Sequence, residues 1–248
     1  MRSKKGFCYC AKQMLVTASA IIALPLHAQP WIVGEAASVE SGELLYQELH
    51  YRSDALALLS DRVEYVAPSG ELLVEKSLNG ARSFITPEVE QNDLRSGTRF
   101  SVNDNGDSLE VRYQRAGQSL VSKRIEKEER LVVDAGFDPY VRANWEALST
   151  GEAIRAEFFV PARLDTVRIS IRQTDAEQCA AISSSALCLV VRPAGILRLV
   201  GWLIDPLYLA YEQDSQRLLM YRGISNLLDE NGEPQNVLIR YQYANPAG

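Results

Sequence analysis

The sequence predicts a mainly β protein, built as a curved antiparallel meander or an open barrel with one or two short helices. Three observations predict it: apolar and polar residues alternate along most of the chain, turn signals separate the alternating runs, and one stretch has the spacing of an amphipathic helix. Because successive side chains of a strand point to opposite faces, alternation indicates strands with one buried face. The pattern lacks the alternating helical crossovers that a parallel nucleotide-binding sheet requires.

The predicted strands are clearest in four runs, at residues 108–113, 154–160, 167–172 and 237–243. Turn signals fall between the runs at Pro68 to Gly70, Asn79 and Gly80, Asn105 and Gly106, Ala116 and Gly117, and Asn231 and Gly232. Asn-Gly tolerates the positive φ angles of tight hairpin turns. We therefore expect neighbouring strands to be joined by short hairpins.

One segment is expected to form a short amphipathic helix. Asp138 and Pro139 are suited to its start and Gly151 to its end, and its apolar face consists of Val141, Trp145 and Leu148. The helix is expected to cover one face of the curved sheet. A mobile lid over a cavity is the alternative, and the sequence does not separate the two.

Residues 1–28 have the layout of a cleavable signal peptide. Basic residues without any acidic one precede the apolar stretch from Met14 to Leu26, and Ala28 suits the cleavage position. An uncleaved membrane anchor, the alternative, needs about 20 apolar residues, and Pro25 and His27 interrupt the run. We expect residues 29–248 to form a single exported β-rich domain without a membrane span.

The charge of the chain argues against nucleic-acid binding. The net charge is −6, and it becomes more negative when the basic N-terminal segment is removed. The mixed run from Lys123 to Arg130 contains both signs of charge, which is typical of a solvated face. No basic cluster is present to bind phosphates, so nucleic acid is not an expected partner.

Cys179 and Cys188 are the two cysteines that follow the signal segment, with eight residues between them. In an oxidising compartment such a pair most simply forms one disulfide. Closing so small a loop stabilises the fold by about 2–3 kcal/mol. A redox pair has closer spacing, and a zinc site needs further ligands, so we expect no metal and no cofactor.

Candidate catalytic residues are scarce. His50 is the sole histidine after residue 28, and it shares a strand face with Tyr46 and Glu48. We expect this to be the wetter face and His50 to be a surface histidine. Gly223 to Leu227 lacks the second glycine of a serine-hydrolase elbow, and Asn103 to Asp107 is better explained as a hairpin turn than as a calcium loop. No catalytic residue is therefore predicted.

The segment from Ala194 to Tyr211 is the most apolar part of the exported region. Its period fits a helix at first and a strand after Pro206. The segment is either a buried core element or the lining of a site for a hydrophobic ligand. On the second interpretation the candidate ligand-binding residues are Trp145, Ile196, Leu199, Val200, Trp202 and Leu203.

The C-terminal third resembles a group of exported Gram-negative proteins of unknown function. The resemblance is carried by the successive elements Leu209-Ala210-Tyr211, Arg217 to Leu219, Tyr221, Gly223, Ser225 and Asn226. Those proteins are curved antiparallel sheets similar to the LolA and LolB lipoprotein carriers, in which an open barrel wraps round a helix and can shelter acyl chains. The resemblance implies that fold and a periplasmic location, and brings no catalytic motif. Gly223 is expected to mark a bulge or bend.

Three functions follow as expectations. The first is a non-enzymatic periplasmic protein that binds or carries a hydrophobic ligand, such as a lipid or acyl chain. The alternative is an interaction module that holds a protein partner of a cell-envelope assembly. The third is a hydrolase of envelope polymers, for which the sequence offers His50 and scattered carboxylates such as Glu152, Glu157 and Asp165.

Overall fold

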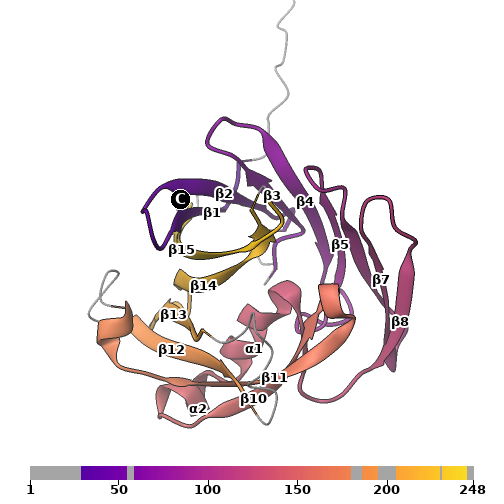
Figure 1. Cartoon of the computed structure of the whole chain (residues 1–248). Coiled ribbons are helices and arrows are strands. Elements are labelled where there is room, and N and C mark those ends of the chain that lie inside the picture. Colours follow the sequence, from indigo (N-terminus) through magenta and orange to yellow (C-terminus); the bar gives the residue numbers. More distant parts are fainter. Residues whose placement is uncertain (1–28, 55–58, 180–185, 195–204, 230, 245–248) are drawn as a thin grey trace, which may run out of the picture.

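The protein is described by a computed structural model over residues 29–54, 59–179, 186–194, 205–229 and 231–244. Over these residues the chain forms one open, curved sheet of 15 strands with two short helices (Figure 1). This confirms the prediction of a mainly β protein built as a curved antiparallel meander.

The first eight strands are β1 (Ile32–Ser38), β2 (Leu44–Tyr51), β3 (Arg62–Val66), β4 (Leu72–Asn79), β5 (Glu88–Asp93), β6 (Arg99–Asp104), β7 (Ser108–Gln114) and β8 (Val121–Glu126). The others are β9 (Leu131–Val133), β10 (Ile154–Val160), β11 (Asp165–Gln173), β12 (Ala186–Pro193), β13 (Leu207–Glu212), β14 (Leu218–Leu228) and β15 (Pro234–Tyr243). Strands that are consecutive in sequence pair with each other, except that β8 and β9 are not paired and form the two edges of the sheet. In addition, β1 pairs with β15. All pairs are antiparallel except β9 with β10. The first and last strands therefore lie side by side in the middle of the sheet.

Most of the predicted turns join consecutive strands as expected. Gly70, Gly106, Gly117 and Gly232 each adopt a positive φ between two antiparallel strands. Asn79 and Gly80 do not form a tight hairpin, because residues 80–87 make a longer connection from β4 to β5. This connection reaches β9, where the backbone N–H of Val133 donates to the carbonyl of Ile85 over 3.1 Å.

The predicted helix is present as two pieces, α1 (Phe137–Ala143) and α2 (Trp145–Ser149). They are separated at Asn144, whose side-chain amide donates to the carbonyl of Tyr140. Val141 and Leu148 are fully buried against β10 to β13, whereas Trp145 is half-buried. Figure 1 shows α1 within the curve of the sheet, so the helices cover a sheet face as expected.

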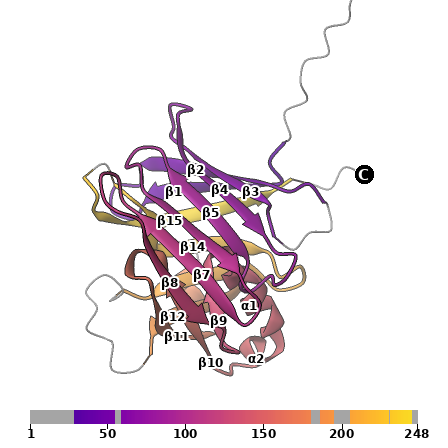
Figure 2. The same ribbon diagram turned by 90° about the vertical axis from the view of Figure 1, so that its right-hand side faces the viewer.

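Two apolar cores share the strands β9 and β10. Leu131, Val133 and Phe159 pack into a core formed by β1 to β7, β14 and β15. Val132 and Val160, which point the opposite way, pack with the helices and β11 to β13. These strands are thus buried on both faces and lie between the cores. Figure 2 shows the strands of the first half running side by side, with α1 and α2 near the lower end of the sheet.

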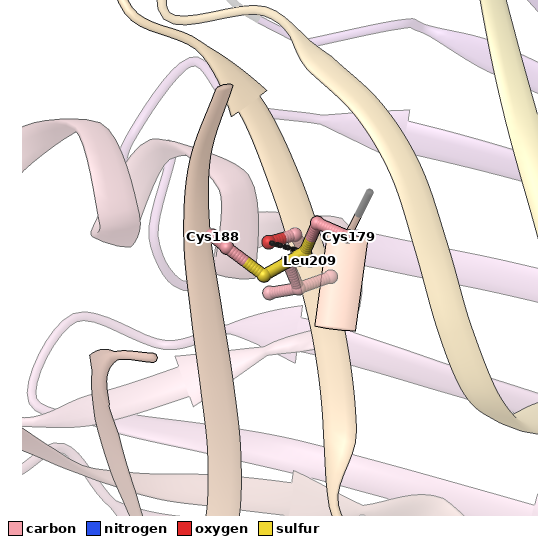
Figure 3. The surroundings of a disulfide bond; sticks show 3 residues. All are labelled: Cys179, Cys188 and Leu209. Carbon is pink, nitrogen blue, oxygen red and sulfur yellow. Dashed lines mark hydrogen bonds between the residues drawn. A yellow bond between two sulfur atoms is a disulfide. The ribbon is translucent and has the colours of Figure 1, made fainter. Parts of the chain in front are cut away.

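The predicted disulfide between Cys179 and Cys188 is present (Figure 3). It joins a short 3-10 helix, η3 (Ala176–Cys179), to β12, with the two Cα atoms 5.9 Å apart. Both cysteines are buried beside Ala210 and Met220, on the face of β13 opposite to Tyr211. The bond therefore fastens η3 to the outside of the sheet.

The apolar segment near the C-terminus divides at Pro206. The strand expected after Pro206 is β13, which confirms that part of the prediction. Gly223 of β14 lies close to Leu207 of the neighbouring strand β13, since a Cβ at Gly223 would be 2.3 Å from a Leu207 methyl. The register of β14 against β15 shifts just after it, between Ile224 and Leu228, as expected of a bulge. None of the helices formed by the described residues has the length and apolar character of a membrane span.

Candidate functional site

His50 lies on the inner face of the sheet. It shares this face with Tyr46 and Glu48, as the alternation predicts, but Tyr46 is 1% exposed and Glu48 6% exposed. The prediction of a wet face and a surface histidine is therefore wrong. The reason is that polar groups of this face bind one another instead of water.

These polar groups form what we call the Glu48 cluster: Trp31, Glu48, His50, Ser60 and Tyr241. The hydroxyl of Tyr241 donates to Glu48 Oε2 over 3.1 Å, and His50 Nε2 lies 3.3 Å from the same oxygen. His50 Nδ1 is 3.3 Å from Ser60 Oγ, which also accepts a hydrogen bond from the Trp31 indole. Burial and the Glu48 carboxylate raise the pKa of Tyr241 well above its usual value, so its hydroxyl remains a donor.

A second cluster of polar and aromatic side chains, which we call the Asp138 cluster, consists of Asp138, Arg142, Trp145, Tyr211 and Tyr243. Asp138 Oδ2 and Arg142 Nη2 form an ion pair of 2.8 Å along α1. The ring of Trp145 meets that of Tyr211 edge to face, with centroids 5.8 Å apart. Asp138 Oδ1, Arg142 Nε and the Tyr211 hydroxyl are buried without a hydrogen-bond partner among the described residues.

The electrostatics of the Asp138 cluster follow from its burial. Burial raises the pKa of the Asp138 carboxyl, and the neighbouring Arg142, Tyr211 and His50 oppose that rise. Burial, followed by the Asp138 charge, raises the pKa of Tyr211 well above its usual value. The side chains of Tyr211 and Asp138 also interact directly, which lowers the pKa of Asp138 and raises the pKa of Tyr211.

The two clusters form one continuous wall, which we call the inner wall. Trp31 packs edge to face against Tyr243 with centroids 5.8 Å apart, and His50 packs against Tyr241 at 6.1 Å. The wall therefore combines aromatic rings with a few polar groups, an arrangement that suits an apolar ligand with a polar end.

The structure places Trp145 in the inner wall. The other predicted ligand-binding residues, Ile196, Leu199, Val200, Trp202 and Leu203, lie outside the described residues. Sequence reasoning missed Asp138, Arg142 and Tyr211 as site residues. The four-residue spacing of Asp138 and Arg142 on a predicted helix was the one available signal for their ion pair.

A separate cleft of about 270 Å³ lies between β8 and the strands β10 and β11. It is lined by Arg124, Ile125, Glu126, Glu128, Leu131, Glu157, Thr166 and Arg168. Most of these side chains are charged, and Glu157 pairs with Arg168 at 2.9 Å. The cleft lies between the two edges of the sheet, with β8 on one side and β9 to β11 on the other. A lipid site is expected to have an apolar lining, and this cleft does not have one. The described part of the chain holds no group of three His, Cys, Asp or Glu that could bind a metal ion.

Comparison with known proteins gives no further guide to the site. No family model matches the chain, and no curated protein or solved structure is significantly similar to it. The function must therefore be inferred from the geometry of the inner wall.

Proposed function

We propose that the protein is a non-enzymatic, exported periplasmic protein that binds or carries a hydrophobic ligand, such as a lipid or acyl chain, against the inner wall. The observation that carries the proposal is the run of aromatic side chains from Trp31 through Tyr243 to Tyr211 and Trp145. Aromatic rings offer a large apolar contact area and keep a polar group at the rim.

The shape of the sheet supports the same proposal. A curved, open sheet with α1 inside its curve is the arrangement implied by the resemblance to the LolA and LolB carriers. Trp145 is half-buried, which leaves part of its ring available to a ligand, whereas the Arg52 guanidinium lies over the ring of Trp31, 3.9 Å from its centre.

Binding is tested with protein purified from a periplasm. We expect native mass spectrometry to detect a co-purified lipid, and a fluorescent fatty acid to bind with one-to-one stoichiometry. Trp145→Ala is expected to weaken binding about 10-fold or more, the equivalent of about 1.4 kcal/mol. Leu120→Ala is the control, because this side chain is 55% exposed in the β7–β8 turn and is not part of the inner wall. Protein that is always empty and takes up no fatty acid would contradict the proposal.

One observation favours a second candidate, a serine hydrolase. Ser60, His50 and Glu48 are arranged as a nucleophile, a base and a group that orients the base. In that role His50 Nδ1 takes the Ser60 proton and Glu48 stabilises the imidazolium. Ser60 is only 7% exposed and already bonded to Trp31, which favours a structural role.

A fluorophosphonate probe separates the two candidates. The binding protein is expected to remain unlabelled at Ser60. Labelling that disappears in both Ser60→Ala and His50→Ala, with the fold intact by circular dichroism, would establish the hydrolase instead.

A further inference from the structure

We infer that one end of the sheet docks on the surface of a membrane that contains anionic lipids, through two hairpin turns and a short helix beside them. This surface is separate from the inner wall, and the inference does not depend on the ligand proposed for that wall.

The strand order places this surface at the end of the sheet opposite to Ile32 and Tyr243. These two residues face each other at one end of the β1–β15 pair, and Ser38 faces Val237 at the other end. Because neighbouring strands are antiparallel, every second connection returns to the Ser38 end, including the turns β5–β6 and β7–β8. Figure 2 shows these hairpin ends on the left of the view and the C-terminus on the right.

Exposed apolar side chains gather at this end. Among the described residues, seven large apolar side chains are exposed, and all except Phe84 lie on turns or strand ends at the Ser38 end. The three most exposed are Leu94, Leu120 and Val121, and each is more than half exposed. Single exposed apolar residues are ordinary, but a group of them at one end of a sheet indicates an interaction surface.

The two turns and a short 3-10 helix form one continuous surface. A Cβ at Gly97, in the β5–β6 turn, would lie 3.1 Å from the side chain of Ala116 in the β7–β8 turn, so the turns are in contact. The 3-10 helix η2 (Pro161–Arg163) lies against β7. Lys123 Nζ of β8 lies 3.4 Å from Asp165 Oδ1, just after η2. We call residues 93–99, 115–123 and 161–165 the basic rim.

The basic rim carries positive charge in an acidic chain. It contains five basic and two acidic residues, a net charge of +3, whereas the whole chain has −6. Both acidic residues are paired within the rim, Asp93 with Arg95 and Asp165 with Lys123. The remaining charge comes from three exposed arginines, Arg99, Arg115 and Arg163.

Apolar side chains among arginines match the chemistry of an anionic bilayer surface. The arginines are attracted by the lipid phosphates, while the apolar side chains enter the boundary between headgroups and acyl chains. Leu94 and Leu120 belong to different turns, and each can enter the lipid independently of the other. A protein partner would instead require a continuous, tightly packed apolar centre.

The charges on the rest of this end determine the direction of approach. The turns β1–β2, β3–β4 and β14–β15 carry acidic residues, including Glu40, Glu43, Glu71, Asp229 and Glu233. An anionic surface repels these turns and attracts the basic rim. The protein is therefore expected to approach the membrane with the β5–β6 and β7–β8 turns first.

The test is flotation of the protein, purified from a periplasm, with lipid vesicles. One set contains phosphatidylcholine alone, and the other contains about one quarter phosphatidylglycerol. We expect the anionic vesicles to bind the protein about 10-fold more tightly or better at low salt, and high salt to remove most of the difference.

A charge reversal tests the basic rim directly. Arg115→Glu changes the charge by two units, and each unit near an anionic surface is worth about 5-fold, so binding should weaken about 20-fold. Arg172→Glu is the matched control, because it makes the same charge change at an exposed position near the opposite end of β11. Its affinity for the vesicles should be unchanged.

A second pair of variants tests the apolar contribution. Leu94→Ser combined with Leu120→Ser should weaken vesicle binding about 10-fold, because two apolar side chains no longer enter the lipid. Phe84→Ser, at the opposite end of the sheet, is the control and should bind as the natural protein does. Leu120→Ala alone is expected to weaken docking while leaving fatty acid uptake unchanged, which keeps the two surfaces distinguishable.

The vesicle comparison on the unsubstituted protein decides the question even if a variant does not fold. Binding to neither set of vesicles, or equal binding to both, would overturn the inference while the proposed function stands. If Arg172→Glu weakens binding as much as Arg115→Glu, then only the net charge of the chain matters and the basic rim is not the docking surface. Circular dichroism of each variant verifies that the fold is intact.

Discussion

Lys76 is the charged residue whose burial most needs an explanation. Its side chain is 4% exposed on the inner face of β4, and its ammonium lies 2.8 Å from Asp134 Oδ1, just after β9. Burial lowers the pKa of Lys76, but the Asp134 carboxylate more than offsets this and keeps the pKa above its usual value. Asp134 has a φ of 46°, a conformation that Asp and Asn adopt more readily than most residues. The pair therefore ties the first half of the sheet to the turn that leads into α1.

Breaking this ion pair is expected to destabilise the fold strongly. Asp134→Asn keeps the backbone conformation but leaves the buried ammonium unpaired, at a cost of about 3–5 kcal/mol. Lys76→Met combined with Asp134→Asn should cost much less than the sum of the single variants, because no charge remains buried. Urea unfolding of the two single variants and the double variant measures the coupling. Additive single effects would show that the pair does not act as a unit.

Asp104 predicts a specific pH dependence. Its side chain is 1% exposed, and its carboxylate accepts from Lys127 Nζ over 2.6 Å and from the backbone of Gly106. Burial raises the pKa of Asp104, yet the hydrogen bonds from Lys127 and Gly106 outweigh it, and the pKa is lowered from 3.8.

A lowered pKa in the folded state means that the folded protein binds the proton less tightly than the unfolded chain. The stability from Asp104 is therefore present above pH 3.8 and is lost as the pH falls through the folded-state value. Asp104→Asn should cost about 1–3 kcal/mol at neutral pH, and the difference from the natural protein should shrink below that pH. Urea unfolding across this range measures it. Asp107→Asn, an exposed change in the same turn, is the control and should show no such difference.

At the scale of the strand, the sequence was informative wherever one face is buried. Val237, Ile239 and Tyr241 alternate in the sequence and all point to the inner face of β15. Strands buried on both faces do not alternate, which is why Leu131 to Val133 was not recognised as a strand. Alternation also does not show which face of a strand is buried when both faces carry polar residues. In β2 the buried face includes Glu48 and His50, so the sequence suggested that this face is exposed. That single ambiguity reversed the expected position of His50.

The candidate site could be predicted only in part, since its contacts join residues that are far apart in sequence. Trp145 was predicted from the apolar face of its helix. Its contact with Tyr211 requires β13 to lie against α2, and no pattern in the local sequence predicts this packing. The ion pair of Asp138 with Arg142 lies within one helix and could be expected from the sequence. The burial of Asp138 Oδ1 and Arg142 Nε depends on the folded chain and could not.

The strand pair β1–β15 joins the two halves of the sheet and has little room for a side chain at Gly34. A Cβ at Gly34 would lie 2.8 Å from the ring of Tyr241, which the bond to Glu48 holds in place. Gly34→Val should destabilise the protein by about 1–3 kcal/mol through overpacking. Glu35→Val, one position along on the other face of β1, is the control. Equal thermal midpoints for the two variants would show that the ring of Tyr241 can move aside.

At the scale of the whole molecule, the topology indicates that the two halves unfold together. β9 and β10 supply Leu131, Val133 and Phe159 to one core and Val132 and Val160 to the other. If either core unfolded, β9 and β10 would expose the apolar side chains that pack in it. These two strands also belong to the other core, which would therefore be destabilised. The pairing of β1 with β15 adds a continuous ladder of hydrogen bonds across the junction.

Two tryptophans report on different elements of this structure, Trp31 beside β1 and Trp145 in α2. In variants that keep one of them and carry Phe at the other tryptophan positions, urea unfolding should give matching midpoints and slopes, as cooperative unfolding requires. Val74→Ala, a fully buried change in the first core, should cost about 1–3 kcal/mol and lower the midpoint reported by Trp145 as much as that reported by Trp31. Val121→Ala, at a 51% exposed position on the edge strand β8, should shift neither midpoint. If Val74→Ala moved the Trp31 transition alone, the halves would be independent units, and the shared strands β9 and β10 would not couple them.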